Sequence, residues 1–185
     1  MSQPDHGKSK AATQASPTRL WLLLALAFVA TFLLIRGGSR SAATGRQADY
    51  SWRVTDLDGR PVDLAQYRGK PIFLNVWATW CPPCVKEMPS IARLAANSKL
   101  ADVVFLCVSE DQEAKEAESF FGSGKPPMTI LHSRGERPGV FMTDGIPATF
   151  VISRDGRIVL AEVGMKDWDD AETVTLLEGL VNETR

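Results

Sequence analysis

Cysteine and histidine are both scarce in this 185-residue chain, which has three cysteines and two histidines. A small secreted scaffold held together by disulfides would need more cysteines, so the fold must rest on a hydrophobic core. Positive and negative residues are nearly balanced, with a formal net charge of -1. This balance gives no electrostatic reason to expect nucleic-acid binding. Internal repeats are also lacking, and the length suits one domain with additional segments.

A single long apolar run, from Leu20 to Ile35, follows a polar N-terminal region and contains no charged residue. Its sixteen residues would reach about 24 Å as an α-helix, slightly less than the ~30 Å hydrocarbon core of a bilayer. Arg19 and Arg36 flank the run. It is either an uncleaved signal-anchor or a signal peptide cleaved within residues 37–45. We favour the anchor, because the run is long and no A-x-A site follows it.

This interpretation divides the chain into four parts. They are a polar cytoplasmic arm (1–19), a transmembrane signal-anchor (20–38), a linker without periodicity (39–50) and a folded domain (51–185). A lone N-terminal apolar segment usually exports the sequence that follows it. We therefore expect a single-pass protein of the inner (cytoplasmic) membrane, with the folded domain on the periplasmic or extracytoplasmic side.

Strand and helix patterns alternate along the predicted domain. Asp58-Gly59 lies between two short strand-like pieces and predicts a hairpin. Apolar and alternating runs predict strands at 71–78, 103–109, 128–132, 148–153 and 158–163. Helical spacing predicts helices at 81–98, 110–122 and 168–183. This order predicts an α/β domain with a mixed central sheet, helices on both faces and an N-terminal β-hairpin extension.

The motif Cys81-Pro-Pro-Cys84 has three competing interpretations. A structural zinc site would need two further Cys or His ligands, but His6 precedes the apolar run and Cys107 falls inside a core-type strand. His132 alone cannot complete such a site. A purely structural disulfide is disfavoured, because closing so small a loop gives little chain-entropy stabilisation. We therefore expect no metal ion and no other cofactor.

The third interpretation is redox chemistry. Cys81 lies at the predicted start of a helix, where the dipole and free N–H groups favour the thiolate that attacks disulfides. Cys84 follows one turn later, close enough to resolve a mixed disulfide, and Trp80 would supply an apolar collar. Pro147 directly precedes a predicted strand, and a cis bond there would expose the backbone of Ile146 to an incoming peptide. Taken alone, these residues favour an ordinary turn proline.

Several stretches resemble the thioredoxin superfamily: "WATWCPPC", Pro89 inside the following helix, and "GIPATF". The longer "LNVWATWCPPCVKEMP", the upstream "DGRPVDLAQYRGKP" and the N-terminal apolar run resemble its TlpA-like branch. That branch comprises membrane-anchored thiol–disulfide oxidoreductases of the cytochrome c maturation and copper-site assembly type. The resemblance spans about residues 52–181. It implies a thioredoxin fold, with nucleophilic Cys81, resolving Cys84 and a substrate-binding set of Trp80, Ile146 and cis Pro147.

Glu87 is the predicted acid/base of the site. Thioredoxin has a buried aspartate in the strand before the motif, whereas this chain has Asn75, which cannot carry a proton. Glu87 follows Cys84 by three residues on the same helical face, and the TlpA-like branch has a glutamate at this position. The alternative is a solvated surface carboxylate. Since a nearby carboxylate raises a thiol pKa while a helix N-terminus lowers it, we predict no strongly acidic Cys81.

The predicted function is reduction of disulfides in partner proteins, such as apocytochrome c or copper-site proteins, through a Cys81–Cys84 dithiol. The resemblance also implies a membrane thiol reductant that recycles the pair. One alternative is a thiol oxidant that forms disulfides in exported proteins, which would use the same residues at a different redox potential. Another is a copper-handling module, although no Met-rich or His-rich motif completes such a site. Cys107 is expected to fill the strand core.

Overall fold

The computed structural model describes residues 44–122 and 124–183. The predicted arm, the predicted membrane anchor and the first residues of the predicted linker lie outside these described residues. Among the helices of residues 44–122 and 124–183, none combines the length and the apolar content needed to cross a membrane.

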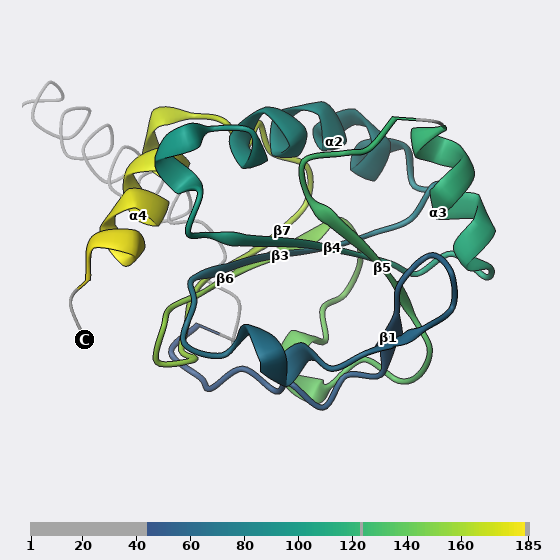
Figure 1. Ribbon diagram of the computed structural model, residues 1–185, viewed down its shortest axis with the longest axis horizontal. Coiled ribbons are helices and arrows are strands. Elements are labelled where there is room, and N and C mark those ends of the chain that lie inside the picture. The colour runs from purple at the N-terminus through teal and green to yellow at the C-terminus, as the bar shows by residue number, and fades with distance from the viewer. Residues whose placement is uncertain (1–43, 123, 184–185) are drawn as a thin grey trace, which may run out of the picture. The chain divides into compact units, whose positions relative to one another are not determined.

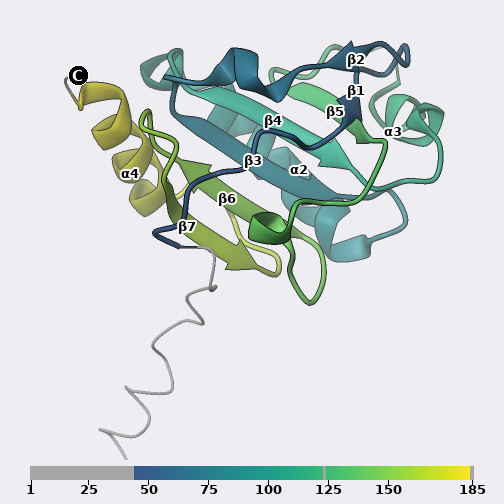
Figure 2. The same ribbon diagram turned by 90° about the horizontal axis from the view of Figure 1, so that it is seen from below.

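One mixed sheet organises the described part of the chain, where it contains seven strands. The strands are β1 (Val54–Thr55), β2 (Pro61–Val62), β3 (Ile72–Trp77), β4 (Val104–Ser109), β5 (Thr129–Ser133), β6 (Ala148–Ile152) and β7 (Ile158–Val163). Their order across the sheet is β2-β1-β5-β4-β3-β6-β7, as Figure 2 shows. β3, β4 and β5 are parallel, and the other neighbours are antiparallel. The predicted mixed sheet and N-terminal hairpin are therefore confirmed.

The described residues also contain three α-helices and three 3₁₀ helices. They are α2 (Pro82–Ala95), α3 (Ala114–Phe121), α4 (Ala171–Asn182), η1 (Leu64–Tyr67), η2 (Ser98–Leu100) and η3 (Gly139–Phe141). The predicted order of elements is confirmed, and the differences lie at their ends. The helix predicted from residue 110 begins at Ala114, because Glu113 and Glu116 form a capping box there. Asp170 caps α4 through a hydrogen bond from the backbone N–H of Thr173.

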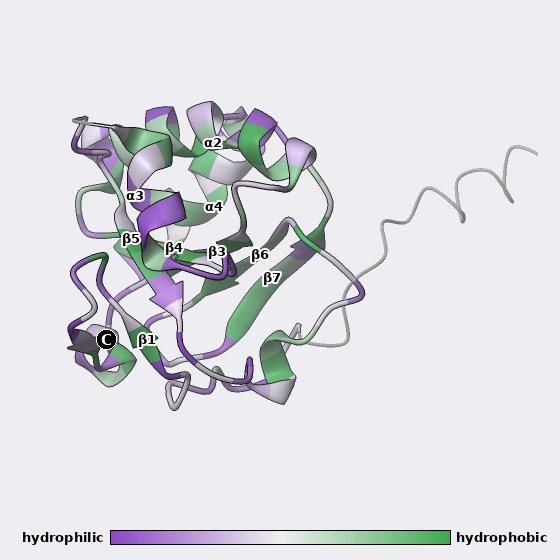
Figure 3. Ribbon diagram, turned by 90° about the vertical axis from the view of Figure 1, so that its right-hand side faces the viewer, coloured by the Kyte–Doolittle hydropathy of each residue, from purple (hydrophilic) through white to green (hydrophobic). Residues whose placement is uncertain are grey.

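The sheet has a hydrophobic cluster on each face, because side chains alternate along β3. Ile72, Leu74 and Val76 join the cluster that includes residues of η1 and η3, whereas Phe73 and Trp77 join the cluster that includes residues of α2, α3 and α4. Figure 1 shows α2 and α3 on one side of the sheet, and Figure 3 shows the mostly hydrophobic strands between the layers. Helical elements thus cover both faces, but the three α-helices of the described residues share one. The right-handed β3-α2-β4-α3-β5 crossovers run in one direction and place α2 and α3 together.

The last residues of the predicted linker belong to the folded domain. The backbone N–H of Gly45 donates to the carbonyl of Ile158 at 2.7 Å, and that of Ala48 donates to Gly156 at 2.8 Å. Tyr50 is buried in the cluster on the η1 side of the sheet. Residues 45–50, which the prediction assigned to the linker, therefore pack with the domain predicted from residue 51. These residues pair with a strand edge far along the chain. Such pairing produces no periodic pattern in the sequence, so the sequence does not predict it.

Candidate active site

Cys81 and Cys84 form a disulfide in the first turn of α2, with their Cα atoms 5.3 Å apart. Cys81 is the N-cap residue, and its Sγ accepts a hydrogen bond from the backbone N–H of Cys84 at 3.4 Å. Pro82 and Pro83 follow, at positions where a helix has no N–H partner to lose. Cys84 is completely buried, whereas Cys81 keeps 4% of its surface exposed. Cys81 is therefore the more accessible sulfur.

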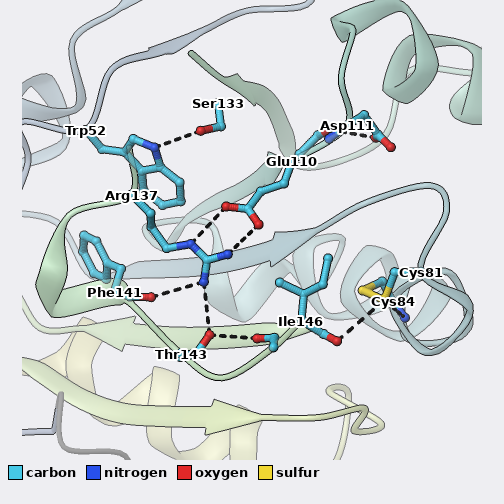
Figure 4. A network of polar contacts seen from close by, with 12 residues as sticks. Trp52, Cys81, Cys84, Glu110, Asp111, Ser133, Arg137, Phe141, Thr143 and Ile146 are labelled. Carbon is cyan, nitrogen blue, oxygen red and sulfur yellow. Dashed lines mark hydrogen bonds and ion pairs between the residues drawn. A yellow bond between two sulfur atoms is a disulfide. The ribbon is translucent and has the colours of Figure 1, made fainter. Parts of the chain in front are cut away.

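A shallow groove of about 420 Å³ runs past this disulfide, and Trp80, Cys81 and Ile146 are among its lining residues. Figure 4 shows the Ile146 carbonyl pointing toward the disulfide, and its oxygen lies 3.7 Å from Cys81 Sγ. The Ile146–Pro147 peptide bond is cis, as the family resemblance implies. Trp80 is 63% exposed at the groove. The structure thus brings together five of the six predicted site residues: Trp80, Cys81, Cys84, Ile146 and Pro147.

Glu87, the sixth, lies away from this groove and is buried, with 2% of its surface exposed. Its Oε1 accepts a hydrogen bond from Asn75 Nδ2 at 2.8 Å. Its Oε2 accepts from the backbone N–H of Lys166 at 3.2 Å and from Trp168 Nε1 at 3.1 Å. Burial raises the pKa of Glu87, and these hydrogen bonds offset part of the rise. The alternative of a solvated surface carboxylate is therefore wrong.

Asp111 stabilises the turn that leads into Cys81 by accepting hydrogen bonds. The sequence did not predict this role. Its Oδ1 accepts hydrogen bonds from the backbone N–H and hydroxyl of Thr79 at 2.9 and 2.8 Å, and its Oδ2 accepts from Ser109 Oγ at 2.7 Å. Asp111 follows β4, which is parallel to β3, so the carboxyl ends of both strands meet here. An acidic residue just past the second of two predicted parallel strands was the available signal.

Cys107 is fully buried in β4, where its Cα pairs with that of Asn75. Burial raises the pKa of the Cys107 thiol, and the charge of Glu87 raises it further. The predicted core position is therefore confirmed. His132 Nε2 lies 2.8 Å from the carbonyl oxygen of Asp111. In the part of the chain that the structure describes, no group of three His, Cys, Asp or Glu side chains is placed to hold a metal ion.

This chain is similar to known proteins in its sequence and in its fold. A model of the Redoxin family matches residues 43–177. The thiol-disulfide oxidoreductase ResA of Bacillus thuringiensis is 28% identical over 158 residues, covering 83% of this chain and 91% of that protein. ResA of Geobacillus kaustophilus is 32% identical over 122 residues, covering 64% and 69%. The thioredoxin domain of a thiol-disulfide oxidoreductase of Bacteroides vulgatus, 22% identical, superposes with a TM-score of 0.63 and covers 77% of this chain and 100% of that one.

Proposed function

This chain belongs to the Redoxin family and is a thiol–disulfide oxidoreductase of the ResA and TlpA-like kind, and we propose that it reduces disulfides in partner proteins of the cell envelope. The observation that carries this proposal is the Cys81–Cys84 pair at the start of α2, beside a groove that leaves Cys81 the more accessible sulfur. The proposed substrates are apocytochrome c or copper-site proteins, which expose cysteine pairs before their cofactors are inserted.

The proposed reaction transfers two electrons from the reduced pair to the substrate. The Cys81 thiolate attacks one sulfur of the substrate disulfide, and the other substrate sulfur leaves as a thiolate that takes up a proton. The Cys84 thiolate then attacks Cys81 Sγ in the mixed disulfide and releases the second substrate sulfur. The products are a substrate dithiol and the Cys81–Cys84 disulfide, the state that the structure shows. A membrane thiol reductant must then return two electrons to the pair.

Glu87 is proposed to exchange a proton with the buried Cys84 thiol during resolution. It lies three residues after Cys84 in the same helix, and its raised pKa brings its titration closer to neutral pH. Asn75 donates to the Glu87 carboxylate and cannot itself supply the proton. Trp80, Ile146 and Pro147 are proposed to bind the substrate backbone next to Cys81.

The domain is proposed to be held at the outer face of the cytoplasmic membrane by residues 20–38, with residues 1–19 in the cytoplasm. The uncharged run from Leu20 to Ile35 supports the anchor. Basic residues flank both ends of the run, so the orientation rests instead on the tendency of a lone N-terminal apolar segment to export the sequence that follows it. Carbonate extraction of membranes, followed by N-terminal sequencing of the mature chain, tests it. An intact N-terminus in the pellet is expected, whereas a chain that begins within 37–45 and washes off would identify a cleaved signal peptide.

The direction of electron flow can be tested with peptides. The reduced chain is mixed with an oxidised peptide that carries the C-x-x-C-H haem-attachment motif, and in parallel with an oxidised copper-site cysteine peptide. We expect reduced peptide and the Cys81–Cys84 disulfide to appear in equal amounts, with a Cys107→Ser variant behaving like the natural chain. If the oxidised chain instead converts the reduced peptides to disulfides, it is an oxidant.

A further inference from the structure

The Arg137 guanidinium connects the end of β4 to the loop that forms one wall of the groove (Figure 4). Nε and Nη2 donate to Oε1 and Oε2 of Glu110 at 3.0 and 2.5 Å. Nη1 donates to the carbonyl of Phe141 at 3.4 Å and to the hydroxyl of Thr143 at 3.1 Å. Four donor contacts therefore use four of the five N–H bonds that an arginine has.

This connection continues to the residue beside the disulfide. The Thr143 hydroxyl donates to the carbonyl of Gly145 at 2.7 Å, and Gly145 immediately precedes Ile146. Residues 142–147 contain no helix or strand. The carbonyl of Pro147 accepts a hydrogen bond from the backbone N–H of Gly164 at 2.8 Å, so the end of the segment next to β6 is held by the backbone, whereas the side-chain contacts of Arg137 hold the end that contains Thr143. The Ile146 carbonyl, 3.7 Å from Cys81 Sγ, thus lies between a backbone contact at Pro147 and the side-chain contacts that begin at Arg137.

The ion pair is shielded enough to act as a fixed support. The Arg137 side chain is 10% exposed and that of Glu110 is 27% exposed. A bidentate arginine–carboxylate pair also fixes orientation, which a lysine cannot do with a single ammonium group. Because its donors point inward, Arg137 has little capacity left to bind a charged group of a partner.

We propose that Arg137 is a positioning residue that holds residues 143–146 beside Cys81 and thereby sets the affinity for protein substrates. The inference rests on the proposed function. A protein substrate must align its backbone with Ile146 before its disulfide reaches Cys81. A small aromatic disulfide needs to reach only Cys81 Sγ in order to react. Loss of Arg137 therefore weakens the binding of a protein substrate and leaves the reaction with a small aromatic disulfide unchanged.

Arg137→Met in the full chain is the principal test. Reduction of insulin disulfides, with dithiothreitol as electron donor, gives kcat and KM for a protein substrate. Reaction of the reduced chain with 4,4′-dithiodipyridine gives the rate with a small one. We expect the insulin KM to rise about tenfold, with kcat, the small-disulfide rate and the reduction potential unchanged. Arg134→Met is the matched control, since Arg134 is exposed and its side chain makes no ion pair or hydrogen bond within residues 44–122 and 124–183.

Arg137→Lys separates positioning from a merely structural ion pair. Lysine can pair with Glu110 but cannot reach Phe141 and Thr143 at the same time with a planar fork. We expect it to restore the melting temperature while the insulin KM stays raised. Thr143→Val, which keeps the ion pair, should raise the KM in the same direction and add nothing to Arg137→Met in the double variant.

The outcomes distinguish the two proposals. An unchanged insulin KM in both Arg137→Met and Thr143→Val contradicts the positioning role, as does an equal fall in the rates with insulin and dithiodipyridine. If Arg137→Met does not fold, Thr143→Val alone decides. A natural chain that reacts with dithiodipyridine but reduces neither insulin nor the C-x-x-C-H and copper-site peptides contradicts the proposed reductase function and, with it, the inference; if it reduces only the peptides, the same KM comparison is made with them.

Discussion

The indole Nε1 of Trp168 donates a hydrogen bond to Oε2 of Glu87 at 3.1 Å, linking the loop before α4 to the buried carboxylate of α2. The Trp168 ring is fully buried and packs edge-on against Phe73 at a centroid distance of 5.2 Å. This donor stabilises the charged form of Glu87, whereas burial disfavours it. Trp168 therefore helps to set the pH at which Glu87 releases its proton.

Trp168→Phe should move the pH dependence of disulfide exchange to higher pH. Phenylalanine keeps most of the packing but removes the N–H donor, so the carboxylate is less stabilised and the pKa of Glu87 rises further. The pH profile of kcat for insulin reduction measures this. Trp52→Phe is the matched control, because it removes a partly buried indole hydrogen bond of 3.1 Å, to Ser133 Oγ, on the other face of the sheet. A Trp168→Phe profile that overlays the natural one would contradict the link.

Glu87→Gln should slow disulfide exchange by about 100-fold, at the low end for general acid–base catalysis. The fold should survive, because the Asn75 amide can turn so that its Oδ1, which has no hydrogen-bond partner within residues 44–122 and 124–183, accepts from the new NH₂ group and from the Thr149 hydroxyl. Stopped-flow kinetics across pH and thiol titrations measure the effect. The exposed Glu118→Gln variant should behave like the natural chain. Identical kinetics of Glu87→Gln at every pH would remove Glu87 from the mechanism.

Glu87 should also make the stability of the protein depend on pH with a defined sign. Its folded-state pKa is raised above the ordinary value of 4.5, so the folded chain binds this proton more tightly than the unfolded chain does. The contribution is fully present below that ordinary value and is lost as pH rises through the raised pKa. Relative to Glu87→Gln, the natural chain should lose stability as pH rises, measured by urea unfolding of the oxidised proteins. A constant difference in unfolding free energy would contradict the raised pKa.

Asp111→Ala should destabilise the turn before Cys81. It removes the acceptor for two Thr79 donors and for the Ser109 hydroxyl, and unpaired buried donors cost about 1–3 kcal/mol. Asp111→Asn should cost less, because the amide keeps one acceptor oxygen and can donate to Ser109. Urea unfolding curves for both, with exposed Asp102→Asn as control, test the ranking. Equal losses for Ala and Asn would show that the side-chain acceptors are not what holds the turn.

Cysteine substitutions should separate the two roles in the motif. Cys84→Ser leaves the attacking Cys81 without a resolving partner, so it should accumulate a mixed disulfide with insulin. Cys81→Ser leaves only the fully buried sulfur of Cys84 and should trap little. Non-reducing electrophoresis and mass spectrometry quantify the adduct, in a Cys107→Ser background if that thiol contributes. Equal trapping by both variants would contradict the assignment of the nucleophile.

Local patterns predicted most of the fold. The apolar run at β3 and the helical spacing after Cys81 placed the strand, the helix and the disulfide at their junction, since these features depend on neighbours in sequence. The contacts that hold the site join residues far apart, as Arg137 with Glu110 and Trp168 with Glu87 show. No periodicity encodes such contacts. The pairing of residues 45–48 with the β7 edge was unpredictable for the same reason.

The Cys81–Cys84 reduction potential tests the central claim most directly. It is measured by equilibrating the full chain with glutathione and dithiothreitol buffers, with the pair quantified by mass spectrometry. A reductant of partner disulfides should have a potential well below about -200 mV, toward that of thioredoxin. A value near -120 mV, typical of a strong oxidant, would show that electrons flow in the opposite direction.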